Sequence, residues 1–345
     1  MSIFFWKKGV KMKKRKTNLA KKYFYLFLPF FNLFLIIAFS SIFSGQNVYI
    51  ENEKGTIAKN VKNERIISVY FHTLDKVEKI NIEDYLVGVL PAEMPPSFNL
   101  EALKAQAVAA RTFILNREGA VDEKHKDATV CTDPAHCKAY MSDDEADEKW
   151  GIEWEKNYKN KIKRAISETR GQILTYDNEP ISAVFHSTSS GKTENSEDVW
   201  QNALPYLRSV ESEGEDKSPR FKSIKEVSIE EFKQKIKALN KDVTFGNDKQ
   251  SWIGNVIYNE SGSVKTITIA GKEFKGTDIR TQFGLRSANF KISIDDKVTF
   301  NVTGNGHGVG MSQYGANHAA ENGYTYDQIL KKYYSGVEIS NMYNY

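Results

Sequence analysis

The stretch from Val89 to Leu115 constrains this chain most, because it joins a proline-rich turn to an alanine-rich helical pattern. Apolar residues recur at three- and four-residue spacing after Asn99, so the sequence predicts a capped helix with one buried stripe. Glu93 precedes this helix within Pro91-Ala-Glu-Met-Pro-Pro96, where apolar neighbours disfavour the ionised form and raise a carboxyl pKa. The alternative is that Glu93 only caps the start of the helix.

Two cations follow on the predicted helix. Lys104 and Arg111 are seven residues apart, which places them on nearly the same side and roughly 10 Å apart along the axis. The helix N-terminus and Lys104 would lower the pKa of Glu93, against the effect of its apolar neighbours. A carboxyl in an apolar turn beside two aligned cations indicates a functional site more than a scaffold.

The first 43 residues predict the cellular location of the chain and its orientation in the membrane. Nine basic residues and no acidic residue occur before Tyr23, and residues 23–43 then run without a charge, long enough to span a bilayer. We expect a cytoplasmic basic tail at 1–22, an uncleaved transmembrane anchor at 23–43, a linker at 44–63 and an extracytoplasmic domain at 64–345. Cleavage as a signal peptide near Ala38-Phe-Ser40 is the alternative.

The exported part is acidic. The chain has 48 Lys and Arg and 44 Asp and Glu, so without the nine basic residues of the tail 39 cations remain against 44 acids, a formal net charge of −5. The basic excess lies beside the predicted anchor and not on a folded face. This distribution argues against a nucleic-acid partner.

Helical and strand-like patterns alternate irregularly along residues 64–345. We predict strands at 65–72, 77–82, 172–176, 181–186, 264–269 and 297–302, and further helices at 159–169, 228–239 and 324–334. Residues 172–186 look like a hairpin. The order of elements predicts an α+β catalytic domain with a smaller lobe inserted at approximately 211–303. The acidic segment 143–155 is assigned no function.

Two further motifs are rich in small residues. His186-Ser-Thr-Ser-Ser-Gly-Lys192 ends a predicted strand and forms a loop whose backbone and hydroxyls can approach a polar ligand, with Lys192 supplying a charge. In Gly304-Asn-Gly-His-Gly-Val-Gly310, alternating glycines remove side chains around His307, so another group must come close to that backbone. An ordinary turn is the alternative for each motif.

The two cysteines of the chain, Cys131 and Cys137, are six residues apart, with His125 and His136 nearby. A disulfide is the default in an exported chain. Two thiolates and one histidine would instead make a three-ligand zinc site with an open fourth position. The spacing supports both interpretations about equally and does not choose between the two histidines.

Together these motifs resemble the stage II sporulation protein D family of endospore-forming bacteria. The resemblance covers roughly residues 60–345 and rests on three motifs in the family's order: Leu90-Pro-Ala-Glu-Met94, His186-Ser-Thr-Ser-Ser-Gly-Lys192 and Gly306-His-Gly-Val-Gly-Met-Ser-Gln-Tyr314. Two departures are small. The family usually reads Ser-Gly-Gly-Lys at 189–192 and Gly-Phe-Gly-His at 304–307.

This resemblance implies a lytic transglycosylase of forespore engulfment. Such an enzyme cleaves the β-1,4 bond between N-acetylmuramic acid (MurNAc) and N-acetylglucosamine (GlcNAc) in denuded peptidoglycan strands and forms 1,6-anhydro-MurNAc. Glu93 matches the family's acid/base. The residues that match other required positions are Lys104, Arg111, Ser189, Lys192 and Tyr314, and we place His307 with them. The resemblance also favours zinc held by His125, Cys131 and Cys137.

The substrate chemistry suggests roles for these groups. We expect these residues either to bind substrate or to support the site. As substrate-binding groups, Lys104, Arg111 and Lys192 would bind the lactyl carboxylate of a muramic residue that lacks its peptide, and Ser189 and Tyr314 would hold sugar hydroxyls. The family implies other engulfment partners, namely an amidase or endopeptidase and a membrane scaffold, at the mother-cell membrane of the septum. The rival functions are a non-catalytic peptidoglycan-binding enhancer of a partner amidase, and a zinc-dependent hydrolase.

Overall fold

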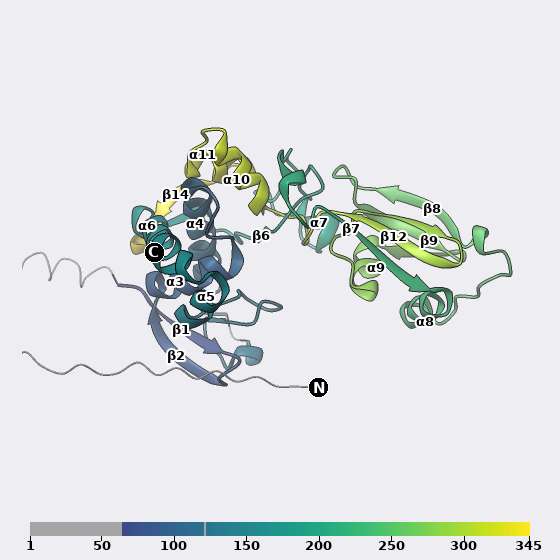
Figure 1. The fold of residues 1–345 in the computed structure, drawn as a ribbon, viewed down its shortest axis with the longest axis horizontal. Coiled ribbons are helices and arrows are strands. Elements are labelled where there is room, and N and C mark those ends of the chain that lie inside the picture. The colour runs from purple at the N-terminus through teal and green to yellow at the C-terminus, as the bar shows by residue number, and fades with distance from the viewer. Residues whose placement is uncertain (1–63, 121) are drawn as a thin grey trace, which may run out of the picture. The chain divides into compact units, whose positions relative to one another are not determined.

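The computed structural model describes residues 64–120 and 122–345, in which helices and strands follow one another in mixed order (Figure 1). The α+β fold class is confirmed. Within these ranges, no helix has both the length and the apolar character needed to cross a bilayer. The predicted tail, anchor and linker at 1–63 lie outside the described residues.

The described chain begins with a β-hairpin that leads directly into the helix carrying Glu93. Strand β1 (Ile66–Phe71) pairs antiparallel with β2 (Lys76–Asn81), and helix α3 (Ile82–Glu93) follows at once. The Asn81 side chain caps this helix by accepting a hydrogen bond from Glu83 N. The short strand β3 (Val130–Cys131) pairs parallel with β1 and so brings the cysteine loop beside the hairpin.

Glu93 is therefore the last residue of a helix, and the prediction that it lies in a turn is wrong. Pro91 lies in the last helical turn, where its missing N–H removes only one hydrogen bond. The residue before a proline is disfavoured in the α conformation, and Met94, which precedes Pro95, is extended with φ −125° and ψ 138°. The prolines thus end the helix just after the carboxyl.

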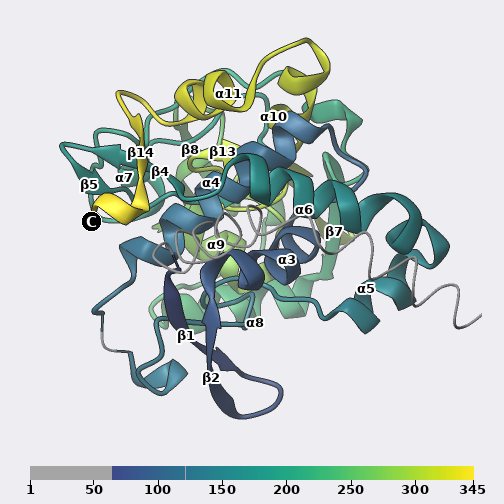
Figure 2. The same cartoon turned by 90° about the vertical axis from the view of Figure 1, so that its left-hand side faces the viewer.

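Helix α4 (Leu100–Asn116) is the centre of the first core and confirms the predicted alanine-rich helix. Asn99 caps it, accepting a hydrogen bond from Glu101 N. It packs against α3 and against four later elements, namely α6 (Lys159–Glu168), β4 (Gln172–Tyr176), α10 (Gln313–Glu321) and α11 (Tyr326–Tyr333) (Figure 2). Because neighbours surround α4, almost all of it from Ala102 onward is buried, not one stripe.

The strands after α6 form only part of the predicted hairpin. Strand β4 pairs with β5 (Glu179–Pro180) and with the C-terminal β14 (Glu338–Asn341). Two tight turns, Ala183 N to Ile181 O and Val184 N to Ser182 O, each 2.9 Å, then carry the chain away from β4. The predicted hairpin is therefore confirmed only near its turn, up to the hydrogen bond from Ile181 N to Leu174 O at 3.1 Å. Beyond it the prediction is wrong, because β6 (Phe185–His186) runs parallel to β13 (Met311–Ser312).

A second hydrophobic core lies in the chain between β6 and β13, and its members range from Val227 to Val302. One sheet has the order β11-β12-β7, with β11 (Phe290–Ile294), β12 (Lys297–Thr303) and β7 (Lys222–Ser228). A second sheet contains β8 (Ile253–Tyr258), β9 (Val264–Ile269) and β10 (Lys272–Lys275), and the helices are α8 (Ile229–Leu239) and α9 (Gly276–Phe283) (Figure 1). All of these elements fall within the segment predicted as the smaller lobe.

The acidic segment after the cysteine loop forms helix α5 (Asp143–Trp150). A capping box between Ser142 and Glu145 starts the helix. The buried Trp154 anchors it, because its Nε1 donates a hydrogen bond to Asp143 Oδ1 at 2.8 Å. The remaining short helices are α7 (Ser196–Val199), a π-helical turn (Trp154–Tyr158) and the 3-10 turns Glu123–His125, Glu215–Lys217, Lys249–Ser251 and Met342–Asn344.

Candidate functional site

Glu93 lines a cleft of about 370 Å³ at the end of α3. Its Oε1 accepts a hydrogen bond from Ala139 N at 2.8 Å. Burial raises the pKa of the Glu93 carboxyl, while the charge of Lys138 and the Ala139 N–H act in the opposite direction. The raised pKa agrees with the prediction from the apolar neighbours, but the opposing cation is Lys138 and not Lys104.

Lys138 is an unusual cation because aromatic rings enclose it. It is 7% exposed, and its Nζ lies 3.7 Å from the ring centroid of Phe185 and 4.0 Å from that of Phe113. Burial lowers the pKa of Lys138 to about 8, and the nearby Glu93 carboxylate opposes that shift. Nothing in the periodicity of the sequence distinguishes this lysine from its solvent-exposed counterparts.

The lining of the Glu93 cleft comes from segments that are far apart in the chain. It consists of Pro91, Ala92, Glu93, Met94 and Pro95 at the end of α3, Lys149 and Trp150 at the end of α5, and Ser187, Pro219, Arg220, Asn305, Gln313 and Tyr314. Glu93 is the only acid among these residues. The other polar groups are hydroxyls, amides and two cations, which suits a neutral or anionic polar ligand.

The parallel pairing of β6 with β13 brings the two small-residue motifs together at this cleft. Thr188 and Asn305 exchange backbone hydrogen bonds of 3.0 and 2.7 Å. Gly306 has φ +124°, and a Cβ there would lie 2.7 Å from the Cβ of His186. The group that comes close to the glycine-rich backbone, as the sequence predicts, is therefore the serine-rich segment.

Tyr314 reaches the cleft from the first turn of α10. Ser312 caps this helix, its Oγ accepting a hydrogen bond from Gly315 N at 3.3 Å. The Tyr314 ring packs edge-on against Phe98, with 5.0 Å between centroids. Glu93 and Tyr314 are the two predicted site residues that line the same cleft.

Ser189 lies outside the cleft and holds the serine-rich loop in place. It is 2% exposed, its Oγ donates to Glu215 Oε1 at 3.0 Å, and its N donates to Glu215 Oε2 at 3.0 Å. Ser212 Oγ also donates to Glu215 Oε1, at 2.6 Å. The Ser189 hydroxyl is buried against this carboxylate, which suits the site-support role expected for Ser189 better than contact with a sugar hydroxyl.

Lys192 and His307 line a separate small cavity of about 10 Å³. Lys192 Nζ lies 3.8 Å from carboxylate oxygens of both Glu211 and Glu260. His307 Nδ1 accepts from Val309 N at 3.1 Å and its Nε2 faces Phe185 O at 3.0 Å, while burial holds its pKa well below the ordinary value. His307 is thus a neutral ring with both nitrogens occupied, which suits the site-support role expected for it better than direct contact with substrate.

Arg111 is part of the core. Its side chain is fully buried, and Nε and Nη2 contact the two oxygens of Glu83 at 3.0 and 2.6 Å. Nη1 donates to Gln172 O at 2.9 Å. Glu83 occupies the guanidinium and no solvent reaches it, which suits the site-support role expected for Arg111 better than direct binding of a substrate carboxylate.

Lys104 also has protein partners. Its Nζ lies 2.7 Å from Glu101 Oε1 and 2.5 Å from Glu168 Oε2, so it ties the start of α4 to the end of α6. It does not line the Glu93 cleft. The structure therefore places Lys104 among the groups that support the helices and not among those that can touch a ligand beside Glu93.

The cysteine loop brings four potential metal ligands together. His125, His136 and Cys137 each place one ligand atom within 4.8 Å of the others. Cys131 Sγ and Cys137 Sγ each lie 3.5 Å from His136 Nδ1, and both cysteines are free thiols. The sequence left His125 and His136 as alternatives, whereas the structure gathers both at one place.

The environment of this cluster fits a divalent metal. Among residues 64–120 and 122–345, neither ring nitrogen of the buried His125 has a hydrogen-bond partner. His136 Nε2 lies 3.0 Å from Asp122 Oδ2, an arrangement in which a carboxylate orients a ligating imidazole. Burial raises the pKa of the Cys131 thiol, and a cation would reverse that direction by stabilising the thiolate. Two sulfurs and two imidazole nitrogens form a donor set typical of Zn²⁺.

Sequence patterns did not predict several residues of the Glu93 cleft, among them Lys149, Trp150 and Arg220, because no local pattern distinguishes them from other residues of their type.

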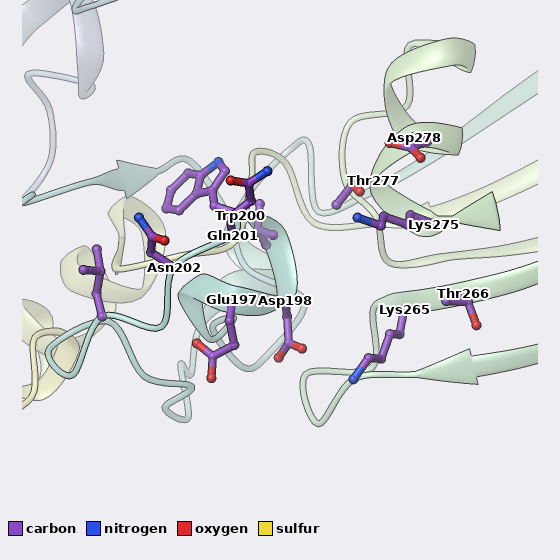
Figure 3. Close-up of a pocket in the computed structure, with 12 residues that line it drawn as sticks. Glu197, Asp198, Trp200, Gln201, Asn202, Lys265, Thr266, Lys275, Thr277 and Asp278 are labelled. Carbon is purple, nitrogen blue, oxygen red and sulfur yellow. The ribbon is translucent and has the colours of Figure 1, made fainter. Parts of the chain in front are cut away.

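A larger cleft of about 800 Å³ lies elsewhere and is lined by none of the predicted site residues. Figure 3 shows Trp200 on one side of it and Lys265 and Lys275 on the other.

The fold and the cleft define a class of α+β proteins in which a helix ends at a partly buried cleft carboxyl and a second core is inserted in the chain. The family model described as "SpoIID: Stage II sporulation protein" matches residues 70–176. Stage II sporulation protein D of Bacillus subtilis (strain 168) is 44% identical over 278 residues, covering 79% of this chain and 78% of that protein. The chain belongs to the stage II sporulation protein D family.

Two other relatives are similar over much of the chain. The stage II sporulation protein D of Bacillus amyloliquefaciens is 42% identical over 277 residues, which cover 79% of this chain and 78% of that protein. A protein named amidase enhancer from Bacillus subtilis (strain 168) is 29% identical over 308 residues, covering 74% of this chain and 40% of that protein. The region matched by the family model contains Glu93 and the whole cysteine loop.

Proposed function

We propose that this protein is a lytic transglycosylase that cleaves the MurNAc–GlcNAc bond of denuded peptidoglycan strands during forespore engulfment. The observation that carries the proposal is that, of the described residues lining the cleft, Glu93 alone carries a carboxyl. A glycoside hydrolase ordinarily needs two carboxyl groups at a defined separation. One carboxyl is enough for a transglycosylase, because the substrate supplies the nucleophile.

The proposed reaction uses Glu93 first as an acid and then as a base. Protonated Glu93 donates its proton to the glycosidic oxygen, so the bond from that oxygen to C1 of MurNAc breaks and GlcNAc leaves with a free hydroxyl. The Glu93 carboxylate then removes the proton of the C6 hydroxyl of the same MurNAc, and O6 bonds to C1. The proton returns to Glu93, and the raised pKa of this carboxyl favours the protonated form that begins the cycle.

The remaining lining suits a sugar chain. Asn305, Gln313, Ser187 and Tyr314 offer amide and hydroxyl groups for sugar hydroxyls and acetamido groups. The Trp150 ring provides an apolar face of the kind on which pyranose rings pack. Of the residues predicted from the sequence, Tyr314 keeps its role as a sugar-binding group.

The cysteine loop is proposed to hold one zinc ion through His125, Cys131, His136 and Cys137. Such an ion would crosslink the loop and contribute folding free energy. Four protein ligands fill a tetrahedral shell, so no position remains open for a reacting water, which argues against the zinc-hydrolase alternative. Lys138 and Ala139 follow the last ligand directly, and Ala139 N holds Glu93. The loop would therefore also fix the position of the acid.

Glu93→Gln tests the proposed reaction. The amide oxygen can still accept the Ala139 N–H, but the side chain no longer exchanges a proton, so release of anhydro-muropeptides from denuded strands should fall by roughly 10²- to 10⁴-fold. Mass spectrometry of the products gives the rate, and an unchanged melting temperature is the control for folding. Full activity of this variant would overturn the assignment of Glu93.

The similarity to a protein named amidase enhancer favours one alternative, a non-catalytic module that binds peptidoglycan and stimulates a partner amidase. A wild-type protein that releases no anhydro products but accelerates a purified amidase would support this alternative. Under either function, we place the protein at the mother-cell membrane of the septum, with cell-wall strands and other engulfment proteins as partners.

A further inference from the structure

The cleft beside Glu93 carries two cations that have no carboxylate partner in the described part of the chain. Lys149 comes from the last turn of α5, and Arg220 from the segment before β7, and both side chains are exposed. Across residues 64–120 and 122–345, neither makes an ion pair, in contrast with Lys104 and Arg111. Lys149 Nζ lies 4.5 Å from the ring centroid of Trp150, a contact that orients the ammonium without neutralising it.

We propose that Lys149 and Arg220 determine the specificity of the cleft by binding the free lactyl carboxylate of a muramic residue. This inference rests on the proposed function, because it assumes a glycan in the Glu93 cleft. The cations that the sequence suggested for binding this carboxylate have other positions. Arg111 forms an ion pair with Glu83, Lys104 forms ion pairs with Glu101 and Glu168, and Lys192 lines a separate cavity. Lys149 and Arg220 are the exposed cations that share the cleft with Glu93.

The chemistry of the lining explains why a carboxylate is the group that these two residues select. A guanidinium binds a carboxylate through two parallel hydrogen bonds, and an ammonium adds a point charge. In a strand that carries its peptides, the lactyl carbonyl is part of an amide, which is neutral and cannot form the same charge-assisted pair. The cleft therefore prefers strands from which an amide-hydrolysing reaction has already removed the peptides.

The test separates binding from cleavage by using the full-length chain with Glu93→Gln as the parent. Two probes are compared by calorimetry: denuded glycan strands with free lactyl carboxylates, and the same strands with those carboxylates reduced to alcohols. Arg220→Gln and Lys149→Gln should each weaken binding of the carboxylate strands on the order of tenfold, the loss expected for one charge-assisted hydrogen bond. Binding of the reduced strands should change less than twofold.

Lys265→Gln is the matched control, because Lys265 is also exposed and without an ion pair among the described residues but lines the other cleft (Figure 3). It should leave the affinity for both probes unchanged. Equal binding of the two probes by the parent, or equal losses on both probes in Arg220→Gln, would overturn the specificity assignment. Failure of wild-type protein to release anhydro products would instead count against the proposed reaction and leave the binding result standing.

Discussion

Replacing Arg111 by methionine distinguishes a core role from a substrate-binding role. The change removes three hydrogen bonds, two to Glu83 at 3.0 and 2.6 Å and one to Gln172 O at 2.9 Å. The Glu83 carboxylate, 4% exposed, would keep the Gly171 N–H at 3.0 Å but lose its countercharge. Breaking a buried ion pair on one side costs ~3–5 kcal/mol, because an uncompensated charge remains in the core.

Urea unfolding of wild type and Arg111→Met measures this loss, and the double variant Arg111→Met/Glu83→Met is the control. Removing both charges should recover most of the stability, since two apolar side chains then replace the pair. The folded fraction of Arg111→Met should retain wild-type affinity for denuded strands. A variant that is as stable as wild type but binds strands more than tenfold weaker would refute the core assignment.

Four other predictions concern Lys104, Glu93 and Cys131. Lys104→Gln should lose only about 1 kcal/mol, because its pairs with Glu101 and Glu168 lie near the surface, and it should leave strand cleavage unchanged in a product assay. Since burial raises the pKa of Glu93, cleavage should decline on the alkaline side at a pH above the ordinary glutamate value, and a pH–rate profile reports that limb. In the wild type, the protonated Glu93 carboxyl favours folding below its unfolded pKa, and this contribution is lost as pH rises through the raised folded pKa. Glu93→Gln does not titrate, so its stability relative to wild type should increase over the pH interval between these two pKa values. Thermal scans at a series of pH values measure the difference. Cys131→Ser or a chelator should lower the melting temperature if the loop holds zinc, with a smaller effect on the rate of the protein that remains folded; a melting temperature unaffected by both would contradict the metal proposal.

Local signals in the sequence were sufficient for some of the individual elements. The Asn99 cap and the apolar spacing identify α4, and the glycines around His307 indicate a close backbone approach. These inferences succeed because capping, periodicity and backbone sterics act within a few residues. Glu93 could also be identified from the sequence as a candidate site residue, because the prolines and apolar residues around it are its neighbours along the chain. The helix that carries Glu93 could not be identified in this way. Pro91 is compatible with the last turn of a helix as well as with a loop.

The sequence by itself thus determined the α+β class, the central helix α4 and the choice of Glu93 as the candidate carboxyl, because each depends on neighbours along the chain. The tertiary structure decided which cations are free. Arg111 pairs with Glu83, and Lys104 pairs with Glu101 and Glu168, while Lys149 and Arg220 line the cleft with no ion pair to any residue that the structure describes. The sequence does not show whether a carboxylate lies beside a charged side chain in the folded protein. Its electrostatic role depends on distances of a few ångströms between segments that only the fold brings together.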